Sequence, residues 1–221
     1  MQDTQSADGL PRLPPGRHGL SRDFVVTNQR DRLTAGIIAT VAERGYHEAT
    51  VSQICAAAGV SRRTFYSYFS SKEECYLQAF ERIGEHLAEA MAAAGSAGNW
   101  PGQVRQRLAA MLAIYAANPD LVRFTLVVPL RAGGEIAVHQ RTALEHLLQS
   151  LTAGRPEDKS LRRPSAAIEH ALVGALVGVI VRKVEAGEGE RLTDLVPELT
   201  EMFLIPYIGR DNAVRAARSN G

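Results

Sequence analysis

Cysteine and aromatic residues are scarce in this chain of 221 residues. It contains two cysteines, Cys55 and Cys75, and only 6% of its residues are aromatic. Two cysteines exclude a disulfide framework and a cysteine-rich zinc site. Both lie on inward faces of predicted helices, where we interpret them as packing residues, with redox sensing as the alternative. Because aromatics are few and alanine, leucine and valine are abundant, helices are favoured over a β-sandwich.

Long apolar runs are also missing. The most apolar stretch, 166–181, is interrupted by Glu169 and His170 and is shorter than the roughly 20 residues of a membrane span. The chain does not open with the charged and apolar regions of a signal peptide. Hydrophobic residues nevertheless make up 45% of the chain, enough for a sizeable core. These features predict a soluble, cytoplasmic protein without a membrane partner.

The sequence lacks the motifs of common enzymes and metal sites. It has no G-x-S-x-G nucleophile motif, no G-x-x-x-x-G-K-[ST] phosphate loop and no paired-carboxylate motif. We therefore expect no catalytic residue and no cofactor, and a small helical enzyme is the alternative class. Glu135, His139 and His146 share a helical spacing that could hold zinc or nickel, but the H-E-x-x-H pattern is absent. We predict no metal site, with metal sensing as the alternative.

Net charge is nearly zero, with 25 lysines and arginines against 24 aspartates and glutamates. The charges are unevenly distributed along the chain. Residues 9–72 carry nine basic and four acidic residues, whereas residues 83–209 carry twelve basic and fourteen acidic ones. This distribution indicates a chain of which only the first part meets a polyanion.

Apolar residues recur at helical spacing, and no strand-like alternation is present, which predicts an all-α fold. The expected helices are 27–44, 51–58, a short helix that Ser61 opens, 71–94, 103–117, 119–130, 134–151, 164–185 and 193–208. Residues 1–22, rich in proline and glycine, are expected to be a mobile arm. Its Arg12, Arg17 and Arg22 could contact DNA, or the arm could be a solvated tail without a role. Residues 210–221 are expected to be a C-terminal tail.

Two short helices joined by a tight turn are predicted within the stretch TVSQICAAAGVSRRTFYSYFSSK, residues 50–72. Thr50 and Gln53 form a capping-box pattern at the start of the first helix. Gly59 ends that helix and suits the left-handed backbone of a tight turn. Ser61 then opens the second helix. This arrangement is typical of a helix-turn-helix.

The second of these helices has one apolar and one polar face. At 100° per residue, Phe65 and Phe69 share the inward side. Arginine can pair with guanine in the major groove, hydroxyls suit phosphate oxygens, and amides at a helix start favour a phosphate. The alternative is an ordinary solvated face above a core of aromatics. The residues with a predicted DNA-binding role are Ser61, Arg62, Arg63, Thr64, Tyr66, Ser67, Tyr68 and Lys72.

The pattern T-V-x-x-I-x-x-A-A-G-V-S-x-x-T-F-Y-x-Y-F-x-S-K-E resembles the helix-turn-helix of the TetR family of bacterial transcriptional regulators. The resemblance extends over residues 27–87. It implies that residues 27–87 form a three-helix DNA-binding domain and that residues 88–209 bind a small effector and dimerise. It also adds Thr50 and Val51 to the DNA contacts. The expected partners are thus an operator in double-stranded DNA, a second copy of the chain and a small molecule.

The predicted helix 164–185 is apolar almost all round, whereas a surface helix has a single apolar stripe. It therefore needs partners on two sides, and we expect one side to meet its own copy across a two-fold axis. The alternative is a central helix buried within one subunit. The predicted interface residues are Ala171, Gly174, Ala175, Gly178, Leu199, Met202 and Phe203.

The effector that the resemblance implies would lie among the helices of residues 103–185. Each candidate lining residue could also be an ordinary core residue. Glu169 and His170 interrupt an apolar run, and a buried charge needs a partner, so we expect a lipophilic effector with one polar group. Release of a repressor from a palindromic operator is the expected mechanism. The candidate lining residues are Met111, Tyr115, Phe124, Val128, His139, Ala143, Glu169, His170 and Val173.

Overall fold

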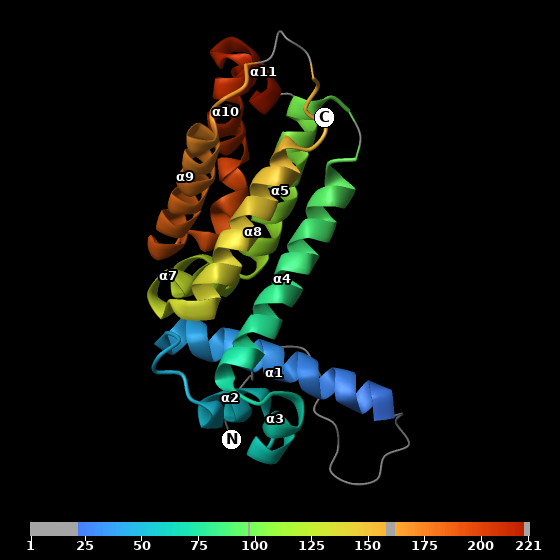
Figure 1. Ribbon diagram of the computed structural model, residues 1–221, viewed down its shortest axis with the longest axis vertical. Helices are drawn as coiled ribbons and strands as arrows, with labels where there is room; N and C mark the ends of the chain where they lie inside the picture. The colour runs from blue at the N-terminus through green and yellow to red at the C-terminus, as the bar shows by residue number, and fades with distance from the viewer. Residues whose placement is uncertain (1–21, 97, 158–161, 219–221) are drawn as a thin grey trace, which may run out of the picture. The chain divides into compact units, whose positions relative to one another are not determined.

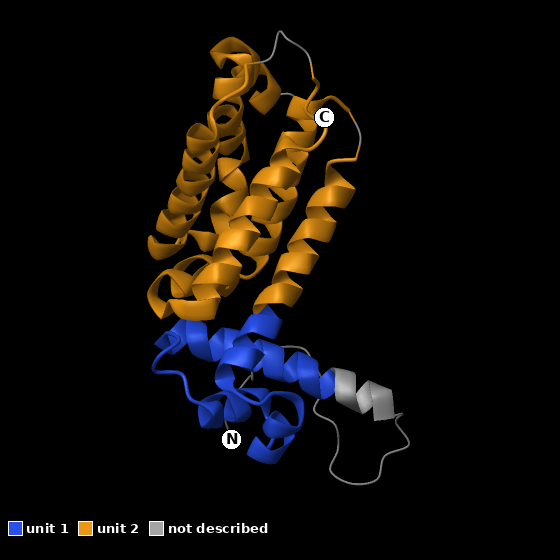
Figure 2. Cartoon of the chain, in the orientation of Figure 1, with its two compact units in different colours: residues 1–79 blue, residues 80–221 orange. Residues whose placement is uncertain are grey.

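The computed structural model of this chain describes residues 22–96, 98–157 and 162–218. Every regular element in these ranges is a helix, which confirms the predicted all-α fold. The chain divides into two compact units, residues 1–79 and 80–221 (Figure 2). Arg12 and Arg17 of the expected arm lie outside the described residues.

From residue 22 onward, the first unit contains three helices and the start of a fourth (Figure 1). These are α1 (Arg22–Arg44), α2 (Val51–Ala58), α3 (Arg62–Tyr68) and the first turns of α4 (Lys72–Ala94). Large apolar side chains from all four helices are fully buried. The unit thus has a core of its own, built by Leu33, Ile37, Ile54, Phe65 and Tyr76.

The second unit holds the rest of α4 and the following elements (Figure 1). They are α5 (Trp100–Ala117), α6 (Asp120–Val122), the π-helical segment η1 (Arg123–Val127), α7 (Val128–Ala132), α8 (Gly134–Thr152), α9 (Ala166–Glu185), the 3-10 segment η2 (Gly189–Leu195), α10 (Val196–Ile208) and α11 (Arg210–Arg218). The core lies chiefly between α5, α9 and α10, and includes Leu108, Leu112, Leu176, Phe203 and Leu204.

No single helix in the described ranges combines the length and apolar composition of a membrane span. Among the described residues, one pair of helices, Trp100–Ala117 and Asp120–Ala132, has this length and composition when the two are taken together, but the pair is bent by 107°.

The predicted helix 119–130 is interrupted by η1. Pro129 has no N–H to donate to the carbonyl of Thr125, four residues earlier, so that carbonyl loses its helical partner. The Nε2 of Gln140, on α8, donates instead to the carbonyls of Thr125 at 3.2 Å and Leu126 at 2.9 Å. A buried side chain thus satisfies backbone groups that the π-helical segment leaves open.

The structure has a helix, α11, where the sequence analysis expects a tail. Ala213 and Ala217 are buried on its inner side. The Nε of Arg105, on α5, donates to the carbonyl of Ala217 at 3.2 Å. The segment therefore packs as part of the second unit, through a small apolar face that the charged residues around it conceal in the sequence.

The buried guanidinium of Arg107 caps the C-terminal ends of two helices. Arg107 is only 8% exposed, and burial lowers the pKa of its guanidinium. Its Nη1 donates to the carbonyls of Ser150 at 2.6 Å and Ala153 at 2.9 Å, and its Nη2 to that of Gly95 at 3.1 Å. These carbonyls lie at the C-terminal ends of α8 and α4, where helix dipoles favour a cation. A Cβ on Gly95 would lie 2.3 Å from the Nε of Arg107, so this close approach requires glycine.

Candidate DNA-binding helix and effector cavity

The two short helices of the first unit are fixed by local capping, as predicted. The Thr50 hydroxyl accepts from the Gln53 N–H at 3.3 Å, and the Gln53 Oε1 accepts from the Thr50 N–H at 2.9 Å. Gly59 ends α2 in the left-handed conformation, with φ 62° and ψ 38°. The Ser61 hydroxyl accepts from the Thr64 N–H at 3.0 Å and so caps α3. The helix-turn-helix geometry therefore follows from its own residues.

Helix α3 has the two faces that its periodicity predicts. Phe65 and Phe69 are buried, and their ring centroids lie 5.5 Å apart. Arg62, Arg63 and Tyr66 are exposed, Tyr66 by 51% of its surface. Within the described residues, neither guanidinium of α3 has a hydrogen-bond partner, which leaves both available to a ligand.

The smaller polar residues of this surface are partly engaged with each other. Ser61 and Thr64 share a hydrogen bond of 2.9 Å between their hydroxyls, and the Ser67 hydroxyl donates to the Thr64 carbonyl at 2.7 Å. Thr50 is exposed at the start of α2, whereas Val51 is half-buried. The strongest unengaged donors of the predicted set are therefore the two arginines.

Lys72 and Tyr68 differ from their prediction as outward contacts. The Nζ of Lys72 donates to the carbonyls of Tyr46 at 2.6 Å and Ala49 at 2.8 Å, and lies 4.4 Å from the Tyr46 ring centroid. Burial lowers the pKa of this lysine, partly opposed by the charge of Glu48. The Tyr68 hydroxyl donates to the Gln29 Oε1 at 2.9 Å. Both side chains hold the first unit together, since two backbone carbonyls bind the ammonium of Lys72 and the side-chain amide oxygen of Gln29 accepts from Tyr68.

We expect Lys72→Ala to lower the free energy of unfolding by about 2 kcal/mol, because two hydrogen bonds to a charged donor are lost. Urea unfolding measures the change. Arg44→Ala, which removes an exposed cation of the same unit, should stay within about 0.5 kcal/mol of the parent chain. Unchanged stability together with a shallower salt dependence of DNA binding would contradict this role and would indicate that Lys72 contacts a DNA phosphate.

Both cysteines are buried in the first unit, as the packing interpretation requires. Cys55 is 4% exposed and Cys75 is 1% exposed. Burial raises the pKa of Cys75 to about 12 and also raises that of Cys55. The thiolate, the reactive form, is therefore strongly disfavoured at neutral pH.

The second unit contains a partly open cavity of about 590 Å³ that is lined by residues of α4, α5, η1 and α8. Four of the predicted lining residues do line it: Met111, Tyr115, His139 and Ala143. Its wall is mainly apolar, and the volume lies in the usual range for small-molecule sites. The further apolar lining residues are Phe80, Leu87, Ala88, Met91, Leu126, Val138, Leu144 and Leu147.

The polar groups of the cavity come mostly from residues that sequence reasoning missed. Tyr115 and Thr125 share a hydroxyl hydrogen bond of 3.1 Å, and burial raises the pKa of Tyr115, which keeps the phenol neutral. Glu81 and Glu85 of α4 also line the cavity. Their i, i+4 spacing is the only signal in the sequence, and it is equally typical of a solvated helix face.

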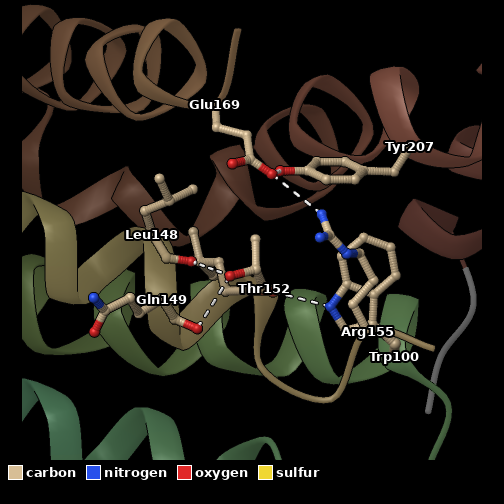
Figure 3. Close-up of polar contacts among 8 residues, drawn as sticks. Trp100, Leu148, Gln149, Thr152, Arg155, Glu169 and Tyr207 are labelled. Atoms are coloured by element: carbon tan, nitrogen blue, oxygen red, sulfur yellow. Dashed lines mark hydrogen bonds and ion pairs between the residues drawn. The ribbon is translucent and has the colours of Figure 1, made fainter. Parts of the chain in front are cut away.

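Five predicted lining residues lie outside this cavity. Phe124, Val128 and Val173 are buried in the helical core, and His170 is exposed. Glu169 does have the partner that its position requires, but the partner belongs to the chain itself (Figure 3). Its Oε1 accepts from the Nη1 of Arg155 at 3.1 Å and from the Tyr207 hydroxyl at 3.0 Å.

This polar cluster joins distant segments of the second unit (Figure 3). The Arg155 guanidinium lies 5.4 Å from the Tyr207 ring centroid, and the Trp100 ring meets that ring edge-on at 5.2 Å. Burial and the neighbouring carboxylate of Glu169 raise the pKa of Tyr207. Glu169 is thus absent from the lining of the cavity, and its Oε1 is engaged by two groups of the chain itself.

Helix α9 is apolar on two sides, and the described residues of the second unit cover one of them. Leu172, Leu176 and Ile180 are buried in the core. The opposite side is exposed and consists of Ala171, Gly174, Ala175 and Gly178, with Ile168 45% exposed. We call these five residues the α9 strip.

The predicted contribution of α10 to the same interface needs correction. Leu199 is 2% exposed and Phe203 is fully buried, so both belong to the unit's own core. Met202 is half-buried. Helical periodicity shows that these residues lie on one helix. It does not show whether each side chain packs into the core of its own unit or lies at a dimer interface.

The candidate metal ligands do not converge. Within the described part of the chain, no three histidine, cysteine, aspartate or glutamate residues are placed to hold a metal ion. His139 uses its Nδ1 on the backbone carbonyl of Glu135, at 2.9 Å, so that pair is not a ligand set. The metal-sensing alternative has no support from this arrangement.

Residues 33–79 match the model of the bacterial regulatory proteins of the tetR family. The fatty acid metabolism regulator protein of Bacillus subtilis is 39% identical over 51 residues, which cover 23% of this chain and 26% of that protein. The matched stretches span from 26% to 37% of the length of the first curated relatives. Sequence similarity is thus concentrated in the helix-turn-helix.

Two solved structures share the fold over most of both chains. The fatty acid degradation regulator FadR of Bacillus halodurans superposes with a TM-score of 0.71 at 22% identity, over 80% of this chain and 94% of that one. The regulator FadR of Bacillus subtilis, solved in complex with stearoyl-CoA, superposes with a TM-score of 0.66 at 17% identity, over 78% and 96%. These similarities extend the likeness in fold to the second unit.

Proposed function

We propose that this chain, which belongs to the TetR family of DNA-binding transcriptional regulators, is a repressor that a small, largely apolar effector releases from a palindromic operator. The family is not enzymatic, so we propose that the protein acts by binding DNA and an effector. The observation that carries the proposal is the exposure of two unengaged guanidiniums on α3, above the buried aromatic pair that holds this helix in place.

In this proposal α3 enters the major groove. Arg62 and Arg63 reach base edges or phosphates, and Tyr66, Ser61 and Ser67 contact the phosphate backbone. Lys72 and Tyr68 are not among the proposed DNA contacts, since the Lys72 ammonium and the Tyr68 hydroxyl form hydrogen bonds within the first unit.

A homodimer follows in this proposal from the α9 strip. Alanine and glycine let a second helix approach closely, and Ile168 adds apolar surface. A two-fold axis along α9 would bring two copies of the same strip together, as an isologous interface requires. The dimer would present two α3 helices to half-sites about 34–36 Å apart, one turn of DNA.

The cavity is the proposed effector site. Its wall is mainly apolar, and stearoyl-CoA, bound by the Bacillus subtilis regulator with the same fold, has a long apolar chain. Helix α4 lines the cavity from Phe80 to Met91 and is continuous with the turns that follow α3. An effector that repositions α4 would change operator affinity by a typical coupling of about 1–3 kcal/mol, roughly 5- to 150-fold.

Gly174→Arg tests the dimer and its link to DNA. A side chain at Gly174 meets open space in the single chain, so we expect the variant to fold as a monomer. Analytical ultracentrifugation should show the parent as a dimer and the variant as a monomer that no longer retards the parent's own upstream DNA. Ala93→Arg, at an exposed site on α4, should leave both properties unchanged. A monomeric parent chain, or a variant that still dimerises, would contradict the interface.

A further inference from the structure

We infer that the effector cavity takes an apolar molecule that carries a positive charge, such as a long-chain amine or quaternary ammonium ion. The inference rests on the proposed function, because it assumes that this cavity is the effector site. It concerns the sign of the effector's charge, which neither the fold nor an apolar wall determines.

The charged groups that line the cavity are of one sign. Glu81 and Glu85 lie one turn apart on α4, and no lysine or arginine is among the described lining residues. Arg82 and Arg141, basic residues on the two helices concerned, are not part of the lining. Among the described lining residues, the other side chains that can carry a positive charge are the imidazoles of His139 and His146, on α8. The wall therefore presents carboxylates without a fixed cation.

The contact between Glu81 and His139 leaves both side chains able to accept a hydrogen bond when the imidazole is neutral. A backbone carbonyl only accepts hydrogen bonds, so the Nδ1 of a neutral His139 ring carries its proton toward the Glu135 carbonyl, at 2.9 Å. The Nε2 then presents a lone pair 3.5 Å from the Oε1 of Glu81. In this tautomer two acceptors face each other, and the cationic group of a ligand can interact with both.

The apolar wall and the carboxylates act on different parts of an amphiphile. A ligand whose chain lies against Met91, Met111 and Leu147 brings its head group beside Glu81 and Glu85, both of which are exposed. Solvent screens charges at such a position, so the expected preference is modest. An anionic head would meet two carboxylates of its own sign, whereas a cationic head would meet two charges of the opposite sign.

Three amphiphiles with the same decyl chain separate charge from apolar contact: decyltrimethylammonium, decanol and decanoate. Titration calorimetry on the full chain, below micelle-forming concentrations and at one fixed alkaline pH, gives each affinity. We expect the cation to bind about 10-fold more tightly than the alcohol and the anion to bind more weakly than the alcohol.

The variant Glu81→Gln/Glu85→Gln should lose the preference for the cation while binding decanol as the parent does. Glu89→Gln, which removes an exposed carboxylate of the same helix outside the lining, should keep the preference and so excludes a general effect of net charge. Decanoate binding as tightly as the cation, or a preference that survives in the double variant, would overturn the inference.

The outcomes also separate this inference from the proposed function. Decanol and decyltrimethylammonium binding equally well, with both weakening operator binding, would refute the charge preference and leave the effector site in place. Absence of binding by all three amphiphiles would refute both the inference and the assignment of the cavity.

Discussion

Arg63→Ala is expected to weaken binding to the operator about 5- to 150-fold, because a bidentate arginine–guanine contact is worth about 1–3 kcal/mol. The Arg63 side chain is exposed on α3, and within the described residues no hydrogen bond occupies its guanidinium. The substitution should therefore change the free energy of unfolding by less than about 0.5 kcal/mol. Loss of affinity without loss of stability would identify a DNA contact.

Mobility-shift titrations over a range of salt concentrations measure this effect on the operator and on a scrambled duplex. Arg63→Ala should reduce the ratio of the two affinities, whereas a phosphate contact would lower both by the same factor. Arg44→Ala, an exposed arginine at the end of α1, is the matched control and should leave the ratio unchanged. An unchanged ratio for Arg63→Ala would show that this residue does not read bases.

Arg107→Met is expected to lower the free energy of unfolding by about 3–5 kcal/mol. The methionine keeps the apolar stem but leaves the carbonyls of Gly95, Ser150 and Ala153 without their buried donor. Because these carbonyls lie at the ends of α4 and α8, which are two of the helices that line the cavity, we also expect weaker effector binding.

Urea unfolding followed by circular dichroism measures the loss. Arg105→Met is the matched control on the same helix, since it removes a single hydrogen bond to the Ala217 carbonyl and should cost about 1 kcal/mol. Gly95→Ala should destabilise in the same direction as Arg107→Met, because its methyl group would collide with the arginine. A loss for Arg107→Met no larger than that for Arg105→Met would contradict this role.

Local features of the helix-turn-helix could be predicted because they depend on residues close in sequence. The Thr50 capping box, the left-handed Gly59 and the Ser61 cap each involve partners within four residues. The inward position of Phe65 follows from helical periodicity. Here hydrogen-bonding chemistry and backbone sterics leave few alternatives.

Contacts between distant residues were not predictable in the same way. The buried charge of Glu169 was correctly expected to need a partner, but Arg155 supplies it from a loop and Tyr207 from α10. Lys72 was predicted to reach DNA, yet two carbonyls more than 20 residues earlier hold its ammonium. Periodicity identifies the face that a residue occupies, and the tertiary fold decides what that face meets.

The π-helical segment and the cavity show a further limit. Pro129 indicates an irregular helix, but only the structure shows that Gln140 satisfies the carbonyl that proline leaves open. The cavity lies where α4, α5 and α8 fail to fill the space between them, which depends on side-chain volumes from three helices at once. Sequence pattern alone therefore identified only some of its lining residues.

Hydroxyl-radical footprinting of the parent chain on its own upstream DNA tests the central claim most directly, because it shows where two copies of α3 meet the duplex. The predicted result is two symmetric protected patches on one face of the DNA, with centres about 34–36 Å apart, that disappear together in Gly174→Arg. Uniform protection, a single patch, or no protection at any concentration that keeps the protein folded would contradict the claim.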